Sequence, residues 1–280
     1  MTVYLYPAVP SKVDGRPQTT IGSFKTATMD AKYFSASDLE GDIDVTLRIW
    51  RDSVPHYDRY QEMQMLQHIH QISLESAPPV FVPISRGTLQ NVHSPYTVPN
   101  RKNGVYLSSF KGSLLNAVVL NSDSSVSQEI DILMEVIEGI KWLHQKGITL
   151  SKVVGTSVLS GLRPDEIFLD ERMKPVATSW LYALDGHLTS PVSVIMHDRS
   201  MQSLTLQQLD LLEYARLVVE VIHHGVSNSY EQAWKWASSM VRGDEEMEGY
   251  GQKTQAKKQL YALSKRLLQE PWHMDAEIIA

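Results

Sequence analysis

The carboxylates of one short segment, Leu162–Asp170, are the side chains in this sequence best placed to do chemistry. Asp165, Glu166 and Asp170 all lie within it. A carboxylate can accept a proton from a substrate or bind a hard divalent cation such as Mg²⁺. A carboxylate in this segment could hold a metal ion, although a solvated loop residue is the simpler interpretation. The segment therefore predicts either a catalytic site or a charged loop.

Opposite charges earlier in the chain offer a second kind of site. Arg48 lies in the β-rich run Val45–Trp50, and Glu62 lies in the amphipathic stretch that follows. The planar guanidinium group favours bidentate pairing with a carboxylate, so we expect a structural salt bridge, with phosphate binding as the alternative. Two pairs of histidines have no supporting acidic or thiol ligands and are interpreted as helix-surface residues: His68 and His70, and His223 and His224.

The composition limits the classes of partner. The net charge is −6, from 26 Lys and Arg against 32 Asp and Glu, which argues against nucleic acid or an anionic membrane. The chain has no cysteine, so disulfides, thiolate nucleophiles and cysteine-based zinc sites are excluded. We find no signal peptide at the N-terminus and no apolar run that approaches the length of a membrane span. A cytoplasmic or nuclear protein is expected.

The hydrophobic pattern divides the chain into parts. Residues 1–20 are predicted to be an irregular lead-in, residues 21–107 a strand-rich part with one helix, and residues 108–280 a mainly helical part. Alternating and β-branched runs predict strands at 45–50, 79–84 and 105–107. Apolar residues at helical spacing predict helices at 57–72, 128–143, 206–224 and 256–268. Strands followed by helices indicate the α+β class.

The order of several short motifs resembles the protein kinase family over about residues 20 to 273. Met134–Ile148 resembles the helix that ends in L-H-x-x-G-I, and Leu162–Asp170 resembles the end of the catalytic loop that follows it. The other matches are Val45–Arg48 to the third strand, Glu62 to the pairing glutamate, Ile21–Phe24 to the glycine-rich loop, Tyr106–Leu114 to the hinge, Asp210 to the loop anchor, and Arg266–Trp272 to the closing motif. The resemblance implies a two-lobed kinase-like fold, one domain overall.

The resemblance also implies that the phosphate-transfer machinery is missing. Gly161 stands where the family has its catalytic aspartate, and glycine cannot accept a proton. Ser179 stands at the metal-binding aspartate and supplies a neutral oxygen where a divalent ion requires a carboxylate. Glu166 replaces the metal-binding asparagine. Asp210 is expected to accept backbone N–H groups from the loop near Ser160 and Gly161.

The corresponding nucleotide site is predicted to be vestigial. Only Gly22 remains of the three glycines of the phosphate-binding loop, and Arg48 replaces the lysine. Glu62 remains as its partner, and the hinge around Leu107 could still recognise an adenine through backbone groups. We therefore expect weak or absent nucleotide binding and no cofactor or metal.

These features predict a pseudokinase, an inactive kinase-like protein that acts as a scaffold or allosteric regulator of a protein partner. The alternatives are a nucleotide-using transferase that relies on Arg48, Glu62 and Glu166, an atypical active kinase on the same fold, and a helical binding module unrelated to kinases. The loop Arg86–Gly104 and the segment Thr149–Leu159, which is longer than the family pattern requires, are the best candidates for partner contacts.

Overall fold

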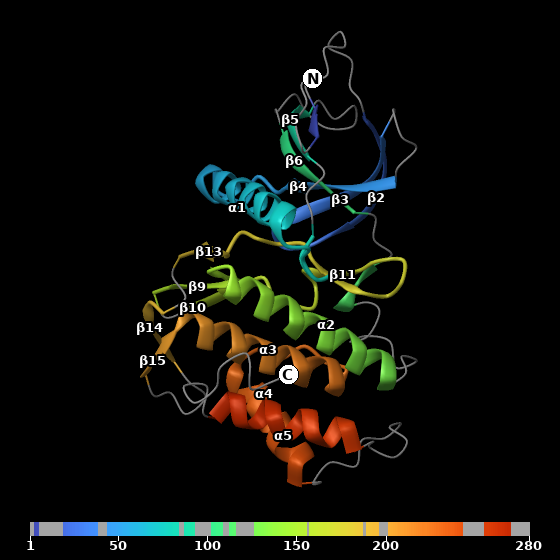
Figure 1. Cartoon of the computed structure of the whole chain (residues 1–280). Helices are drawn as coiled ribbons and strands as arrows, with labels where there is room; N and C mark the ends of the chain where they lie inside the picture. Colours follow the sequence, from blue (N-terminus) through green and yellow to red (C-terminus); the bar gives the residue numbers. More distant parts are fainter. Residues whose placement is uncertain are drawn as a thin grey trace.

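A computed structural model of the chain describes residues 3–5, 19–38, 44–83, 87–92, 102–108, 112–115, 126–155, 157–186, 189–195, 201–242 and 255–269. Within these ranges both helices and strands are present, so the predicted mixed class is confirmed. The larger sheet and α1 lie on one side of the molecule, and α2, α3, α4 and α5 lie on the other (Figure 1).

Six strands form one antiparallel sheet in the order β1-β5-β6-β4-β3-β2. They are β1 (Val3–Leu5), β2 (Thr19–Ala27), β3 (Ala31–Asp38), β4 (Asp44–Trp50), β5 (Gly87–Val92) and β6 (Lys102–Ser108). Strand β4 lies inside the sheet, where Arg48 is opposite Tyr33 of β3 and Val105 of β6. This register sets Arg48 and Tyr33 side by side.

Helix α1 (His56–Glu75) connects β4 to β5 and lies beside the sheet (Figure 1). Its inner face carries Met65, Leu66 and Ile69, which are buried at the helical spacing of three and four residues. These side chains belong to a continuous hydrophobic core that extends from the sheet to α5. Glu62 is buried on the same helix, so α1 brings a carboxylate into the protein interior.

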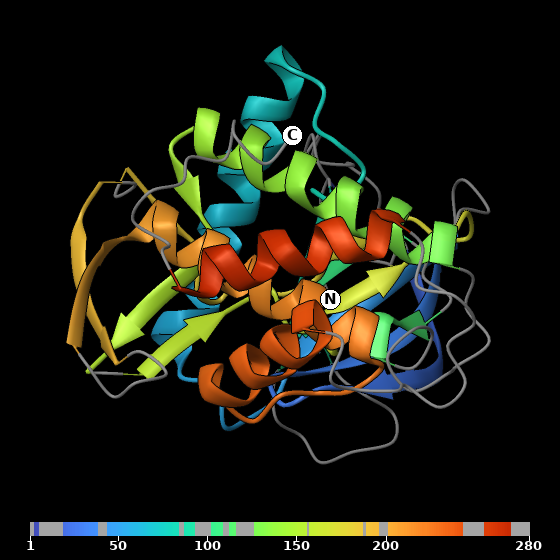
Figure 2. The same cartoon turned by 90° about the horizontal axis from the view of Figure 1, so that it is seen from below.

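The helical part contains α2 (Val126–Gln145), α3 (Leu206–His223), α4 (Tyr230–Arg242) and α5 (Gln255–Gln269). Helices α3, α4 and α5 pack against one another (Figure 2). Helix α3 is buried on nearly all sides, as its apolar sequence predicts. It begins at a capping box formed by Thr205 and Gln208, and it ends at His224 in the left-handed conformation.

Short strands position the loops of the site; the first in the chain precedes α2, and the others lie between α2 and α3. β7 (Gly112–Ser113), β11 (Ile167–Leu169) and β12 (Pro175–Ala177) form one small sheet. The other pairs are β8 (Ile148–Thr149) with β13 (Leu184–Asp185), β9 (Ser151–Val154) with β10 (Ser157–Ser160), and β14 (Pro191–Ile195) with β15 (Met201–Thr205).

Two predictions for the first part of the chain are wrong. No strand forms over residues 79–83: the N–H group of Val82 donates to the carbonyl of Pro79 and closes a turn. Pro79 and Pro83 have no N–H groups to contribute to a sheet, which explains the difference. The loop predicted at 86–104 instead contains β5 and the start of β6. Its residues 93–101 lie outside the described ranges.

Other elements were not predicted. The lead-in of residues 1–20 contributes β1 and the first two residues of β2. Helix α4 and the hairpin β14–β15 were not assigned, because their apolar residues do not form a long periodic run. Across the residues that the structure describes, no helix is both long and apolar enough to cross a membrane.

Candidate functional site

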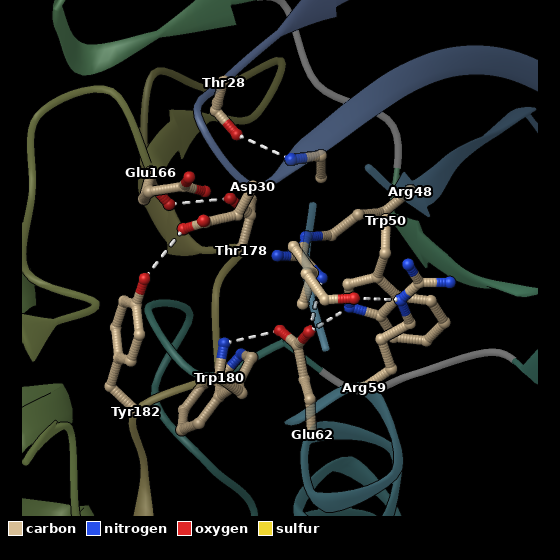
Figure 3. Close-up of polar contacts among 12 residues, drawn as sticks. Thr28, Asp30, Arg48, Trp50, Arg59, Glu62, Glu166, Thr178, Trp180 and Tyr182 are labelled. Carbon is tan, nitrogen blue, oxygen red and sulfur yellow. Dashed lines mark hydrogen bonds and ion pairs between the residues drawn. The ribbon is translucent and has the colours of Figure 1, made fainter. Parts of the chain in front are cut away.

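A buried ion pair joins the sheet to α1. Nη1 of Arg48 lies 2.5 Å from Oε2 of Glu62, and the two side chains are 1% and 0% exposed (Figure 3). Glu62 accepts two further hydrogen bonds, from the indole N–H of Trp50 and, over 2.7 Å, from the backbone N–H of Trp180. The predicted pair is confirmed. The three donors compensate the carboxylate for its lost hydration.

Tyr33 connects this pair to the loop segment below it. Its hydroxyl accepts a hydrogen bond from Nε of Arg48 over 3.2 Å, and it lies 3.2 Å from Oε2 of Glu166 and 3.1 Å from Oγ1 of Thr178. Its ring is tilted against Phe168 of β11, with centroids 4.7 Å apart. A fully buried tyrosine therefore fills the space between the sheet and β11. Sequence reasoning missed Tyr33.

Glu166 is buried at the centre of this contact. Loss of hydration raises the pKa of its carboxyl to about 7, and the charge of Arg48 opposes this rise. Oε1 of Glu166 has no hydrogen-bond partner among the described residues. Thr178 fixes the backbone here, because its N–H and its hydroxyl both donate to the carbonyl of Glu166. Glu166 is thus a buried carboxyl at the margin of ionisation near neutral pH.

Gly161 and Ser179 touch through the backbone. A Cβ atom at Gly161 would lie 2.6 Å from the carbonyl oxygen of Ser179, so no side chain fits at this position without movement of the backbone. The Ser179 side chain is buried, and its hydroxyl has no hydrogen-bond partner in the described part of the chain. An aspartate could not replace Gly161 in this conformation. The arrangement provides no proton acceptor here.

The longer segment predicted at Thr149–Leu159 forms the hairpin β9–β10. The N–H group of Gly161 donates to the carbonyl of Leu150 over 3.2 Å, which closes the base of the hairpin. Lys152 on β9 lies 3.5 Å from Asp58 on α1. The hairpin therefore contacts the helix that carries Glu62, and it directly precedes the segment Leu162–Asp170.

Asp210 anchors this loop from α3, and the anchoring donor differs from the prediction. Its Oδ2 accepts from the N–H of Leu150 over 2.9 Å and lies 2.9 Å from Nε2 of His144. The predicted donors near Ser160 and Gly161 are wrong: the donor is Leu150, and the N–H group of Gly161 donates to the carbonyl of Leu150 instead. The expectation that Asp210 is buried and accepts a backbone N–H group is confirmed.

The predicted phosphate loop is not a turn. Gly22 lies within β2, and the turn between β2 and β3 is formed by Thr28–Asp30, where the hydroxyl of Thr28 accepts from the N–H of Ala31. Leu107 lies in β6 opposite Thr46, while residues 109–111 of the predicted hinge lie outside the described ranges. Gly22 and Leu107 are therefore not brought together with Arg48 and Glu62 by any contact described.

No metal centre is formed by the described residues, among which no three His, Asp or Glu side chains gather. His68 lies 3.5 Å from Asp185, His223 stacks on Trp236, and His224 contacts Glu129. His70 is buried, against the prediction of a surface residue.

Two solvent-open hollows lie outside the Tyr33 contact. One, of about 330 Å³, is lined by residues that include Arg163, Asp165 and Tyr182; the other, of about 380 Å³, lies between α1 and residues 183–185. Neither is lined by Tyr33 or Glu166. No model of a known protein family matches the chain, and no curated protein matches it significantly. The function must therefore be argued from the geometry.

Proposed function

We propose that the chain is a kinase-like domain with a closed nucleotide site, a pseudokinase that acts by binding a protein partner. The order of the elements supports this proposal. An antiparallel sheet with α1 between β4 and β5 precedes a helical part built on a buried α3, in the sequence that the motif resemblance implies. The buried Arg48–Glu62 pair and the contact of Asp210 with the N–H group of Leu150 lend it further support.

One observation carries the proposal: the side chains expected to hold phosphate and metal are sealed from solvent. The exposed fractions are 1% for Arg48, 0% for Glu62, 0% for Glu166 and 1% for Ser179, and Tyr33, which packs among them, is 0% exposed. A ligand site in an unoccupied protein is normally an open, concave surface. Here Tyr33 occupies the space between β3 and β11, and its hydroxyl contacts one polar atom each of Arg48, Glu166 and Thr178.

The chemistry of phosphate transfer is also poorly supported. The reaction depends on positioned metal ions, a cation on the phosphates and a carboxylate that accepts a proton. Gly161 leaves no room for the carboxylate, and Ser179 offers a neutral hydroxyl. Arg48 is committed to Glu62 and Tyr33. The remaining surfaces, including the hairpin β9–β10, are available for contacts with a partner.

The second candidate is a nucleotide-using transferase that relies on Arg48, Glu62 and Glu166. It is favoured by the close approach of these three charged groups around Tyr33. It requires Tyr33 to leave its buried position before a nucleotide can enter. We rank it below the binding function because the tyrosine hydroxyl would lose contacts to three side chains.

One experiment with labelled ATP tests these functions together. The protein is incubated with ATP labelled at either the α- or the γ-phosphate, with Mg²⁺ or Mn²⁺ and a protein mixture. The proposal predicts no transfer of either label. Transfer of the γ-phosphate identifies an active kinase, and transfer of the α-phosphate identifies a nucleotidyl transferase. A Tyr33→Phe preparation serves as a matched control, because it keeps the ring in place and leaves the site closed.

A further inference from the structure

Three charged side chains of α3 lie on one face of the helix, at the edge of a hollow of about 330 Å³. They are Glu213, Arg216 and Glu220, which are three and four residues apart. The hairpin β9–β10, the loop at residues 162–165 and the turn between β2 and β3 form most of the remaining lining. We call this site the α3 hollow.

The two glutamates of the α3 hollow share a single cation. Nε of Arg216 lies 3.2 Å from Oε1 of Glu220, and Nη1 of Arg216 lies 4.0 Å from Oε2 of Glu213. The other two charges of the lining, Arg163 and Asp165, are paired with each other through hydrogen bonds of 3.0 and 2.5 Å. Among the described residues that line the hollow, three carboxylates thus accompany two guanidinium groups. One negative charge is left uncompensated when all of these groups are ionised.

One oxygen of each glutamate is left for a ligand. Oε1 of Glu220 accepts from Nε of Arg216, from the hydroxyl of Ser227 and, over 2.9 Å, from the N–H group of Ser227. Oε1 of Glu213 accepts from the hydroxyl of Tyr230. Neither Oε2 atom accepts a hydrogen bond from the residues that the structure describes, and neither is fully buried, although the two side chains are only 5% and 3% exposed. Two nearly buried carboxylates therefore present unused acceptor atoms to the hollow.

The surroundings of these carboxylates favour a bound cation. Loss of hydration raises the pKa of Glu213 and of Glu220, and in both cases the charge of Arg216 opposes this rise. The charge of Glu220 raises the pKa of Glu213 further. Glu220 also lies in the last turn of α3, where the helix dipole favours positive charge. A second cation would compensate both glutamates.

We propose that the α3 hollow binds an alkylguanidinium group, with the cation against Glu213 and Glu220 and the alkyl stem along the apolar wall. A guanidinium group carries five N–H donors in one plane, so it can bridge two carboxylates. It is less strongly hydrated than an ammonium group and therefore loses less on entering a nearly buried site. Long basic side chains bury their stems on apolar surface in the same way. The apolar wall consists of Leu115, Val158, Leu159, Leu162, Pro164 and Val226.

The same chemistry is found in two sources, a free guanidine compound and an arginine side chain of another protein. The volume of about 330 Å³ is at the lower end of the range for small-molecule sites, which suits a single group of this size. The hollow is not lined by Tyr33 or Glu166. This site and the closed nucleotide site can therefore fail separately.

Titration of the isotope-labelled full chain, followed by amide NMR, tests the proposal. The amide of Ser227 is the reporter, because it donates to Glu220. Butylguanidine should shift this signal saturably and bind more tightly than butylammonium. Butylurea has the same shape without the charge and should bind at least roughly tenfold more weakly than butylguanidine.

A blocked Gly-Arg-Gly peptide and its citrulline counterpart distinguish the two sources. Tighter binding of the arginine peptide than of butylguanidine identifies an arginine side chain of a protein as the ligand. Equal or weaker binding of the peptide identifies a free guanidine compound. Both results support the site, provided that the neutral citrulline peptide binds at least roughly tenfold more weakly than the arginine peptide.

Glu220→Gln and Glu213→Gln should each weaken the binding of butylguanidine by roughly tenfold, because each removes one charge and keeps an oxygen for its present donors. Glu138→Gln is the matched control: it removes the same charge from a carboxylate that is 52% exposed on α2 and should leave the affinity unchanged. If one site variant does not fold, the other variant and the comparison with butylurea still decide.

The absence of a saturable shift with both butylguanidine and the arginine peptide would overturn the proposal. So would an equal response to butylurea, or an equal loss of affinity in Glu138→Gln and the two site variants. Tighter binding of butylammonium would overturn the choice of a guanidinium ligand.

Discussion

The hydroxyl of Tyr33 lies 3.2 Å from Oε2 of Glu166, a residue 133 positions later in the chain, and both side chains are fully buried. This contact joins the sheet to the loop segment that carries the predicted catalytic residues. It fills the space between β3 and β11 with packed protein. The stability of this contact, and its response to pH and mutation, can be measured.

The free energy of unfolding should depend on pH through Glu166. Burial raises its pKa in the folded protein to about 7, from an ordinary value of 4.5, so between these values the folded protein binds more protons than the unfolded chain. The contribution of Glu166 to stability is therefore full below pH 4.5 and falls as the pH rises through 7, by about 3 kcal/mol in total.

Urea unfolding from pH 5 to pH 8 measures this dependence, with Glu166→Gln as the comparison. The variant has no titrating group at this position, so its stability should fall less steeply than that of the wild type over the same range. Parallel curves for the two proteins would show that Glu166 is not the group responsible.

Loss of Arg48 should be costly because it leaves Glu62 buried and unpaired. We expect Arg48→Met to lower the free energy of unfolding by about 3–5 kcal/mol. In a Glu62→Gln background the same change should cost clearly less, since no buried charge is stranded. A double-mutant cycle by chemical denaturation checks this, and strictly additive effects would contradict a direct ion pair.

Gly161→Ala should destabilise the fold even though the change adds only one methyl group. The new Cβ atom would lie 2.6 Å from the carbonyl oxygen of Ser179, and the backbone must move to relieve the overlap. Gly112→Ala is the matched control, because nothing lies within 4 Å of its Cβ position. Thermal unfolding should separate the two variants. Equal melting temperatures would refute the steric argument.

Asp210→Ala should weaken the loop that the residue anchors. Removal of the carboxylate leaves the N–H group of Leu150 without its acceptor, which we expect to cost about 1–3 kcal/mol or more. Amide hydrogen exchange at Leu150 should become faster than in Asp185→Ala, a variant of a half-exposed carboxylate on β13. Unchanged protection at Leu150 would argue against the anchor.

The sequence was sufficient to predict the features that depend on local pattern and charge. The main helices and the run 45–50 follow from periodicity, and the pairing of Arg48 with Glu62 was expected from the motif resemblance. Tyr33 could not be identified, because its role depends on strand register and on contact with residues 133 and 145 positions away.

The loop before Leu162 was beyond prediction for a related reason. The hairpin from Ser151 to Ser160 changes which N–H group donates to Asp210. The pairing of its two strands is a three-dimensional contact that local pattern does not show. The identity of Gly161 indicated that a catalytic carboxylate is missing. Only the contact with Ser179 explains why no side chain is accommodated there.

Titration calorimetry with ATP, in the presence and absence of Mg²⁺, tests the central claim most directly. The closed contact of Tyr33 with Glu166 and Arg48 predicts no saturable binding of ATP up to millimolar concentrations. Cooperative unfolding of the same preparation serves as the control that the protein is intact. Saturable, Mg²⁺-dependent binding in the low micromolar range to the wild-type chain would contradict the claim, since Tyr33, Arg48 and Glu166 are sealed from solvent in the structure.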